Sequence, residues 1–185
     1  MRQRPVDGGA RMRKTPGIAL AVLAAVAAAL VLPAAAHPAS RARAEFQDAL
    51  AAQINELRAD HGLKPLDVST KLGAAAEEQA RSMGSEGYFS HTSPSGRTFS
   101  SRIARFYPPS EADRWAVGED LCVGPAALTA ADCLRMWLAS PPHRHVLLYP
   151  GFRELGVSAL AVDDAPGAFD GADTVIVVAD FGLRS

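Results

Sequence analysis

The sequence predicts an α+β domain in which helices cover an antiparallel sheet. Apolar residues recur at spacings of three and four in the first half of the region expected to fold, which is typical of helices with one buried face. Strand-like runs rich in Val, Ile and Phe gather in the second half, with a short Gly- and Asp-rich connection between the last two. Helices and strands in separate runs, rather than in alternation, favour the α+β class.

The N-terminal region predicts export. Residues 1–17 hold five Arg or Lys and one Asp, residues 18–32 form an unbroken apolar run, and Ala34-Ala35-Ala36 is a small-residue cleavage signal. This order indicates a secretory signal peptide over residues 1–36. Its fifteen apolar residues are short for a membrane span, which needs about 20. A retained anchor is the alternative, and Met12 is an alternative start.

Cleavage after Ala36 leaves a short polar tether over residues 37–44 and one domain over residues 45–185. The whole chain has 19 basic and 20 acidic residues; subtracting the five basic and one acidic residues of the leader leaves 14 and 19, a net charge of −5. No basic stripe is present, so nucleic acid is excluded as an expected partner, because phosphate binding needs clustered Lys and Arg. The protein is expected to be secreted and extracellular, with a membrane contact only through the signal peptide.

Three helices are expected first. The first begins at Glu45 and ends at Gly62, and its apolar stripe consists of Phe46, Leu50, Ile54 and Leu57. Asp67 or Ser69 can cap the second helix. It ends near Gly84 and Gly87, and its small-residue face comprises Leu72, Ala75, Ala76, Gln79, Ala80 and Met83. A third, short helix over residues 98–106 places Phe99, Ile103 and Phe106 on one side.

A strand, a helix and a hairpin follow. Residues 115–123 read as a strand, and a glycine within a strand often marks a bulge or a close approach. Thr129 caps a helix over residues 130–139, which ends at Ser140 because two prolines follow. Two further strands, at residues 156–162 and 174–181, flank an acidic loop.

Cys122 and Cys133 are the only cysteines and lie eleven positions apart. An even count in an oxidising compartment favours a disulfide. Closing so short a loop would contribute about 3 kcal/mol to stability. Two buried free thiols are the alternative.

Several segments, in this order, resemble the CAP superfamily of cysteine-rich secretory proteins, antigen 5 and pathogenesis-related 1 proteins, in its bacterial SCP-like extracellular branch. Together they cover about residues 45–182. They read Asn-Glu-Leu-Arg at 55–58, Gly-Leu-Lys-Pro-Leu at 62–66, Tyr-Phe-Ser-His-Thr-Ser-Pro-Ser-Gly at 88–96, Gly-Glu-Asp-Leu at 118–121, Trp-Leu-Ala-Ser-Pro-Pro-His-Arg at 137–144, Phe-Arg-Glu-Leu-Gly-Val at 152–157 and Phe-Gly at 181–182.

The resemblance implies a three-layer α–β–α sandwich with a small antiparallel sheet. It also implies an open cleft with two His and two acidic residues, which in some members binds a divalent metal. By position, His91 and His143 match the two histidines and Glu119 matches the first acid.

The second acidic position of the family holds Ser140 in this chain. The set is therefore incomplete, and Glu154 is the nearest remaining carboxylate in sequence that could substitute. The residue after Glu119 also departs from the family, because it is Asp120 where the family usually has Asn.

We expect His91 and His143 to be the metal-facing pair, because imidazole suits Zn²⁺ and other borderline-soft divalent ions. Glu119 is expected to orient a ligating ring from outside the ligand set. The alternative is a hydrogen-bonded polar network that ties the sheet to two loops. His145 is expected to be a solvated loop residue.

The expected function is that of a secreted, monomeric, non-catalytic binding module whose cleft takes a small or lipid-like ligand or a cell-envelope component. The alternative is a metal- or His/Glu-dependent hydrolase of peptidase type, and a purely structural envelope protein is a third reading. No serine lies in a Gly-x-Ser-x-Gly elbow, so no catalytic residue is assigned.

Overall fold

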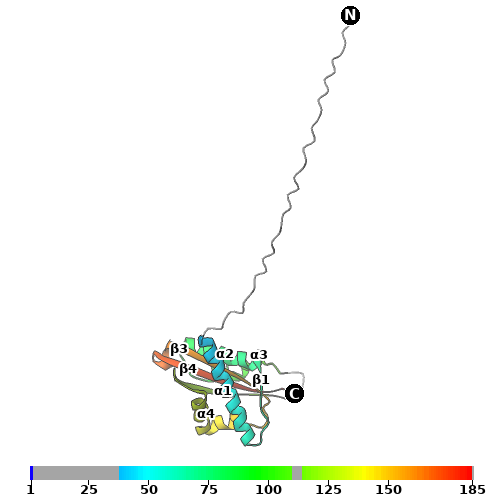
Figure 1. Cartoon of the computed structure of the whole chain (residues 1–185), viewed down its shortest axis with the longest axis vertical. Coiled ribbons are helices and arrows are strands. Elements are labelled where there is room, and N and C mark those ends of the chain that lie inside the picture. The colour runs from blue at the N-terminus through cyan, green and yellow to red at the C-terminus, as the bar shows by residue number, and fades with distance from the viewer. Residues whose placement is uncertain (2–37, 110–113, 185) are drawn as a thin grey trace, which may run out of the picture. The chain divides into compact units, whose positions relative to one another are not determined.

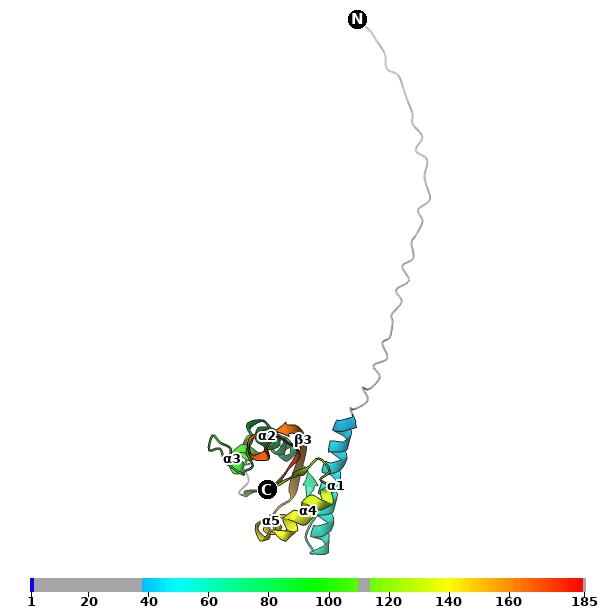
Figure 2. The ribbon, with the colours of Figure 1, turned by 90° about the vertical axis from the view of Figure 1, so that its left-hand side faces the viewer.

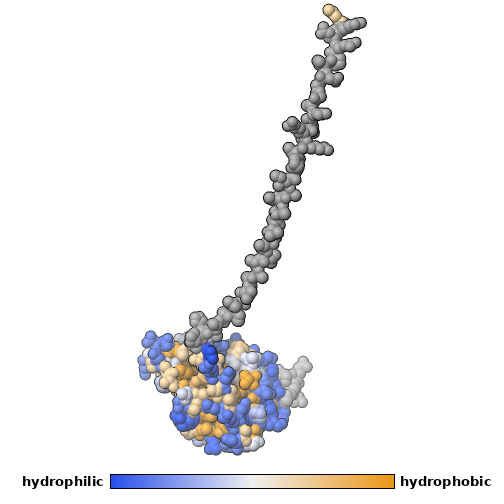
Figure 3. All heavy atoms as spheres, viewed as in Figure 1, coloured by the Kyte–Doolittle hydropathy of each residue, from blue (hydrophilic) through white to orange (hydrophobic). Residues whose placement is uncertain are grey.

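The computed structural model describes Met1 and residues 38–109 and 114–184 (Figure 1). The predicted signal peptide and its cleavage site lie outside the described residues. Within the described residues, no helix is both long and apolar enough to cross a membrane. On the face drawn in Figure 3, hydrophilic and hydrophobic residues are interspersed over the folded part of the chain.

A four-stranded sheet in the order β1-β3-β4-β2 forms the middle layer. Strand β4 (Ala172–Arg184) pairs antiparallel with β2 (Trp115–Pro125) on one side and with β3 (Glu154–Ala165) on the other. The two-residue β1 (Asp67–Val68) pairs in parallel with the start of β3. The sequence did not predict β1, because two residues carry no periodicity.

Helices cover both faces of this sheet, as Figure 2 shows. Helices α2 (Thr70–Glu86) and α3 (Phe99–Phe106) pack on one face. On the other face lie α1 (Pro38–Asp60), α4 (Ala130–Ala139) and α5 (Pro141–Leu147). The predicted α+β sandwich of three layers is thus confirmed.

Two segments that were not expected to be helical are helical in the structure. Helix α1 begins at Pro38, so the expected polar tether over residues 37–44 is helical from that residue on. Helix α5 begins at Pro141, directly after Ser140 closes α4. The prolines were interpreted only as a stop, but a proline is well suited to the first turn of a new helix, where its missing N–H has no intrahelical partner to lose.

The remaining elements follow the predicted order. The Thr98 and Thr129 side chains cap α3 and α4, and Thr129 forms a reciprocal capping box with Asp132. The hairpin strands extend further than predicted, so the connection between them shortens to residues 166–171 and contains the 3₁₀ turn Gly167–Phe169.

Glycines allow the layers to approach closely at two points on the sheet. A Cβ atom on Gly118 would lie 2.8 Å from the Phe152 ring and 3.2 Å from Val146, so α5 and its following loop sit directly on β2. A Cβ atom on Gly156 would overlap the backbone of Leu72 and Gly73 in α2. These contacts set the positions of the helices that border the site.

Cys122 and Cys133 are free, buried thiols between β2 and α4, so the predicted disulfide is not formed in this structure. Burial raises the pKa of the Cys133 thiol, and a hydrogen bond from Cys133 lowers the pKa of Cys122. The sulfurs are therefore neighbours. The structure thus matches the alternative reading of two buried free thiols.

Candidate functional site

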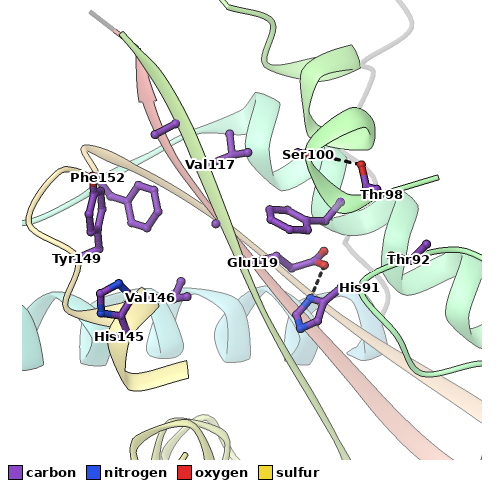
Figure 4. A pocket seen from close by; sticks show the side chains of 13 residues that line it. His91, Thr92, Thr98, Ser100, Val117, Glu119, His145, Val146, Tyr149 and Phe152 are labelled. Atoms are coloured by element: carbon purple, nitrogen blue, oxygen red, sulfur yellow. Dashed lines mark hydrogen bonds and ion pairs between the residues drawn. The ribbon is translucent and has the colours of Figure 1, made fainter. Parts of the chain in front are cut away.

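An open cleft of about 670 Å³ lies beside β2, next to His91 and Glu119 (Figure 4). Its two ends differ in chemistry. One end carries polar groups from His91, Thr92, Thr98, Ser100 and Glu119. Apart from His145 and Gly118, the rest of the lining is apolar and aromatic, namely Phe99, Ala116, Val117, Val146, Tyr149 and Phe152.

The polar end is built on a contact between His91 and Glu119. The Nδ1 of His91 lies 2.8 Å from Oε1 of Glu119, as the dashed line in Figure 4 shows. Glu119 is 4% exposed on β2, whereas the His91 side chain is 45% exposed. The carboxylate accepts a hydrogen bond from Nδ1–H of His91. In this tautomer of the neutral ring, the lone pair is on Nε2.

Arg102 forms a buried ion pair with Glu119. This arginine of α3 is 2% exposed and donates from Nη2 to Oε2 of Glu119. Its Nη1 donates to Oε1 of Gln79 on α2 at 2.7 Å. Gln79 in turn donates from Nε2 to the carbonyl oxygen of Ser90 at 2.7 Å, next to His91. The result is a closed hydrogen-bonded ring that joins α2, α3, β2 and the His91 loop.

A second carboxyl group, that of Asp180, lies in the same buried layer. Asp180 faces Glu119 across the β2–β4 pair, and its Oδ1 lies 3.5 Å from Nη2 of Arg102. Complete burial, and then the negative charge of Glu119, raise the pKa of Asp180 well above its usual value, against the opposing effect of Arg102. The Arg102 guanidinium is therefore shared by two buried carboxyl groups, those of Glu119 and Asp180.

Helix α5 carries the two other histidines considered for the site, His143 and His145. His143 is half-buried, and burial followed by the charge of His91 lowers the pKa of His143, so the two rings lie within electrostatic range of each other. His145 is exposed and lines the cleft on the side opposite His91 (Figure 4). It lies on a helix rather than in the predicted loop. Ser140 ends α4, where its N–H donates to the Trp137 carbonyl at 3.1 Å.

Glu154 is held away from the polar end of the cleft. Its Oε1 accepts a hydrogen bond from the Tyr107 hydroxyl at 2.5 Å, and Nε of Arg184 lies 3.8 Å away. It is not among the residues that line the cleft. Glu154 is near the other site residues in sequence, but it lies on β3, which β4 separates from β2, the strand that carries Glu119.

The residues in place supply few metal ligands. Across residues 38–109 and 114–184, no group of three or more His, Cys, Asp or Glu side chains is arranged to hold a metal ion. Both oxygens of Glu119 are engaged, one by His91 and one by Arg102. A metal at this site would depend on the imidazoles of His91 and His143.

Sequence reasoning missed Arg102 and Asp180 and treated Gln79 only as part of a packing face. A signal for Arg102 was present, since it lies at the helical spacing of Phe99, Ile103 and Phe106 and so occupies the stripe expected to be buried. A charged residue on such a stripe needs a buried partner. No comparable pattern singles out the partner on β4.

Comparison with known proteins supports a family assignment. The profile of the CAP family, described as the cysteine-rich secretory protein family, matches residues 51–181. The chain belongs to this family, as its motifs indicated. The uncharacterized protein YkwD of Bacillus subtilis is 30% identical over 103 residues, which are 56% of this chain and 38% of that relative. The chain thus spans well under half of the relative's length.

Solved structures agree with the fold. An outer surface protein of Borrelia burgdorferi is 26% identical with a TM-score of 0.64, covering 76% of this chain and 94% of the other. An extracellular SCP-domain protein of Bacillus anthracis is 22% identical with a TM-score of 0.61, covering 83% of this chain and 45% of the other. These similar structures come from extracellular or outer-surface proteins.

Proposed function

We propose that this protein is an exported binding module whose cleft takes a small amphipathic or lipid-like ligand. The observation that carries the proposal is the division of the cleft into a polar end, at His91 and Glu119, and an aromatic wall. Ligand sites in proteins are typically apolar hollows of this size with a few convergent polar groups. The ligand's polar group lies against His91, and its apolar part lies along Phe99 and Phe152.

The polar end favours binding over hydrolysis. Glu119 is occupied by Arg102 and His91, so it is not positioned to take a proton from a water molecule or a nucleophile. Among the described residues, Glu119 is also the one side chain hydrogen-bonded to His91. A nucleophile activated by this imidazole would need such a bond.

A divalent ion such as Zn²⁺ is proposed to bind weakly beside the polar end of the cleft, which His91 lines and His143 does not. His91 and His143 would hold it, with water in the remaining positions, and Glu119 would orient the His91 ring. Such an ion would supply a positive charge for an anionic ligand group. With two protein ligands, affinity falls well below that of a structural zinc site.

Ligand binding is tested with a dansylated fatty acid, whose fluorescence rises in an apolar site. Phe99→Ala should weaken binding about tenfold, because it removes an aromatic wall of the cleft. Phe89→Ala is the matched control, since Phe89 is 41% exposed and lies outside the cleft lining. Equal affinities for the two variants, both folded by circular dichroism, would contradict the proposal.

Metal binding is tested by calorimetry with Zn²⁺. His91→Ala and His143→Ala should each weaken binding more than Glu119→Gln, because Glu119 does not ligate the ion. Binding should fade below about pH 6, as the imidazoles become protonated. If both alanine variants bind like the wild type, the ligand assignment is wrong.

A further inference from the structure

A second hollow adjoins the central cleft. It has a volume of about 570 Å³ and lies between the end of α4, helix α5 and the segment that leads to β3. Its apolar surface includes Leu138, Leu148 and Pro150, and its polar side chains are those of Arg144 and His145. None of these residues has a role in the function proposed above.

The two hollows meet at His145 and Tyr149, which line both. Their ring centroids are 6.2 Å apart. Tyr149 also packs edge-on against Phe152 of the central cleft, with centroids 4.8 Å apart. Figure 4 shows His145 and Tyr149 together at the end of the cleft opposite His91. The two hollows therefore adjoin at these two rings, and the pair is called the groove, with Tyr149 as its ridge.

The groove lies in a cationic part of an otherwise acidic chain. Residues 133–153 contain three Arg and two His but no Asp or Glu, whereas residues 37–185 carry a net charge of −5. Arg135 pairs with Asp132, and Arg153 donates to backbone carbonyls. Arg144 is exposed, and its guanidinium has no partner among the described side chains. It is the cation available to a ligand in the second hollow.

We propose that the second hollow, with the ridge at Tyr149, binds an extended acidic peptide segment. An acidic side chain, or a C-terminal carboxylate, pairs with Arg144, because the planar guanidinium can donate two parallel hydrogen bonds to a carboxylate. Apolar side chains of the peptide occupy the two hollows on either side of Tyr149.

The two adjoining hollows suit a peptide better than an acyl chain. In an extended peptide, residues i and i+2 point to the same side about 6.6–6.8 Å apart, so they can straddle one aromatic ring. An acyl chain has no such alternation and gains nothing from a ridge between two hollows. This site does not depend on metal binding at His91.

The test is fluorescence anisotropy, without added metal, using a fluorescein-labelled hexapeptide of alternating Leu and Glu. The same peptide with Lys in place of Glu is the charge control. We expect the acidic peptide to bind at least tenfold more tightly than the basic one, and Arg144→Ala to weaken binding of the acidic peptide about tenfold. Arg135→Ala, which removes the same charge outside the groove, should leave affinity within about twofold.

Equal binding of the two peptides, or equal effects of Arg144→Ala and Arg135→Ala, would overturn the proposal. Binding to vesicles containing phosphatidylglycerol, with no binding of the acidic peptide, would assign the groove to a membrane instead and would also overturn it. Because zinc and the dansylated fatty acid are absent from this experiment, its failure leaves the function proposed for the central cleft unaffected.

Discussion

Asp120 is the side chain whose surroundings are least suited to its charge. It is fully buried on β2, and neither carboxylate oxygen has a hydrogen-bond partner among the described residues. Burial, and then the negative charge of Glu119, raise the pKa of Asp120 to about 8, from an ordinary value of 3.8. The CAP family usually has Asn at this position. An Asn side chain carries no charge, so burying it does not require a proton to be held.

Replacing Asp120 should stabilise the protein in a pH-dependent way. The folded state holds a proton that the unfolded state loses near pH 4, so Asp120 reduces stability progressively from about pH 4 to about pH 8. Asp120→Asn should raise the free energy of unfolding by on the order of 3 kcal/mol at pH 7, and by little near pH 4. Urea denaturation at the two pH values measures this.

The exposed Asp163→Asn is the control for Asp120→Asn and should have a small, pH-independent effect. A stability gain for Asp120→Asn that is the same at pH 4 and pH 8 would show that ionisation of this carboxyl does not govern the effect.

At the scale of elements, α2 packs on β3 through a close backbone approach at Gly156. Gly156 faces the backbone of Leu72 and Gly73 so closely that no Cβ atom fits between them. The same face of the sheet also carries Asp180, which pairs with Gly156, and Glu119, which pairs with Asp180. The contact therefore sets the depth at which α2 presents Gln79 to Arg102.

Two glycine substitutions on either side of this contact should have opposite effects. Gly156→Ala should destabilise the fold by about 3 kcal/mol, because backbone atoms would have to move apart. Gly73→Ala, in the helix opposite, meets no atom within 4 Å of its new Cβ and should stabilise by about 1 kcal/mol through helix propensity. Thermal unfolding of both variants decides this, and a Gly156→Ala protein as stable as the wild type would refute the packing argument.

At the scale of the whole molecule, the similar structures come from extracellular or outer-surface proteins, and the leader motif predicts the same destination. The predicted order is a basic segment, an apolar run and small residues ending at Ala36. Intact mass spectrometry of protein recovered from the culture medium should therefore give a chain that begins at His37.

A substitution that places a bulky charged side chain at the cleavage site is the control for processing. Ala36→Arg should leave the leader attached, because the peptidase requires small residues there. Recovery of wild-type protein only from the cytosol, at full length, would refute export.

The sequence by itself determined α2, α3, α4 and most of α1, the long strands and the family, but not α5. Apolar spacing, cap residues such as Thr129 and the motifs around His91, Glu119 and His143 are local signals, so they can be read without knowing what packs against them. Only the tertiary structure decided which side chains share the site. Arg102, Glu119 and Asp180 come from α3, β2 and β4, and a pairing register and two helix contacts had to form before they could meet. The same strand order keeps Glu154 away from the cleft, because β4 lies between β3 and β2, and Glu154 contacts Tyr107 instead.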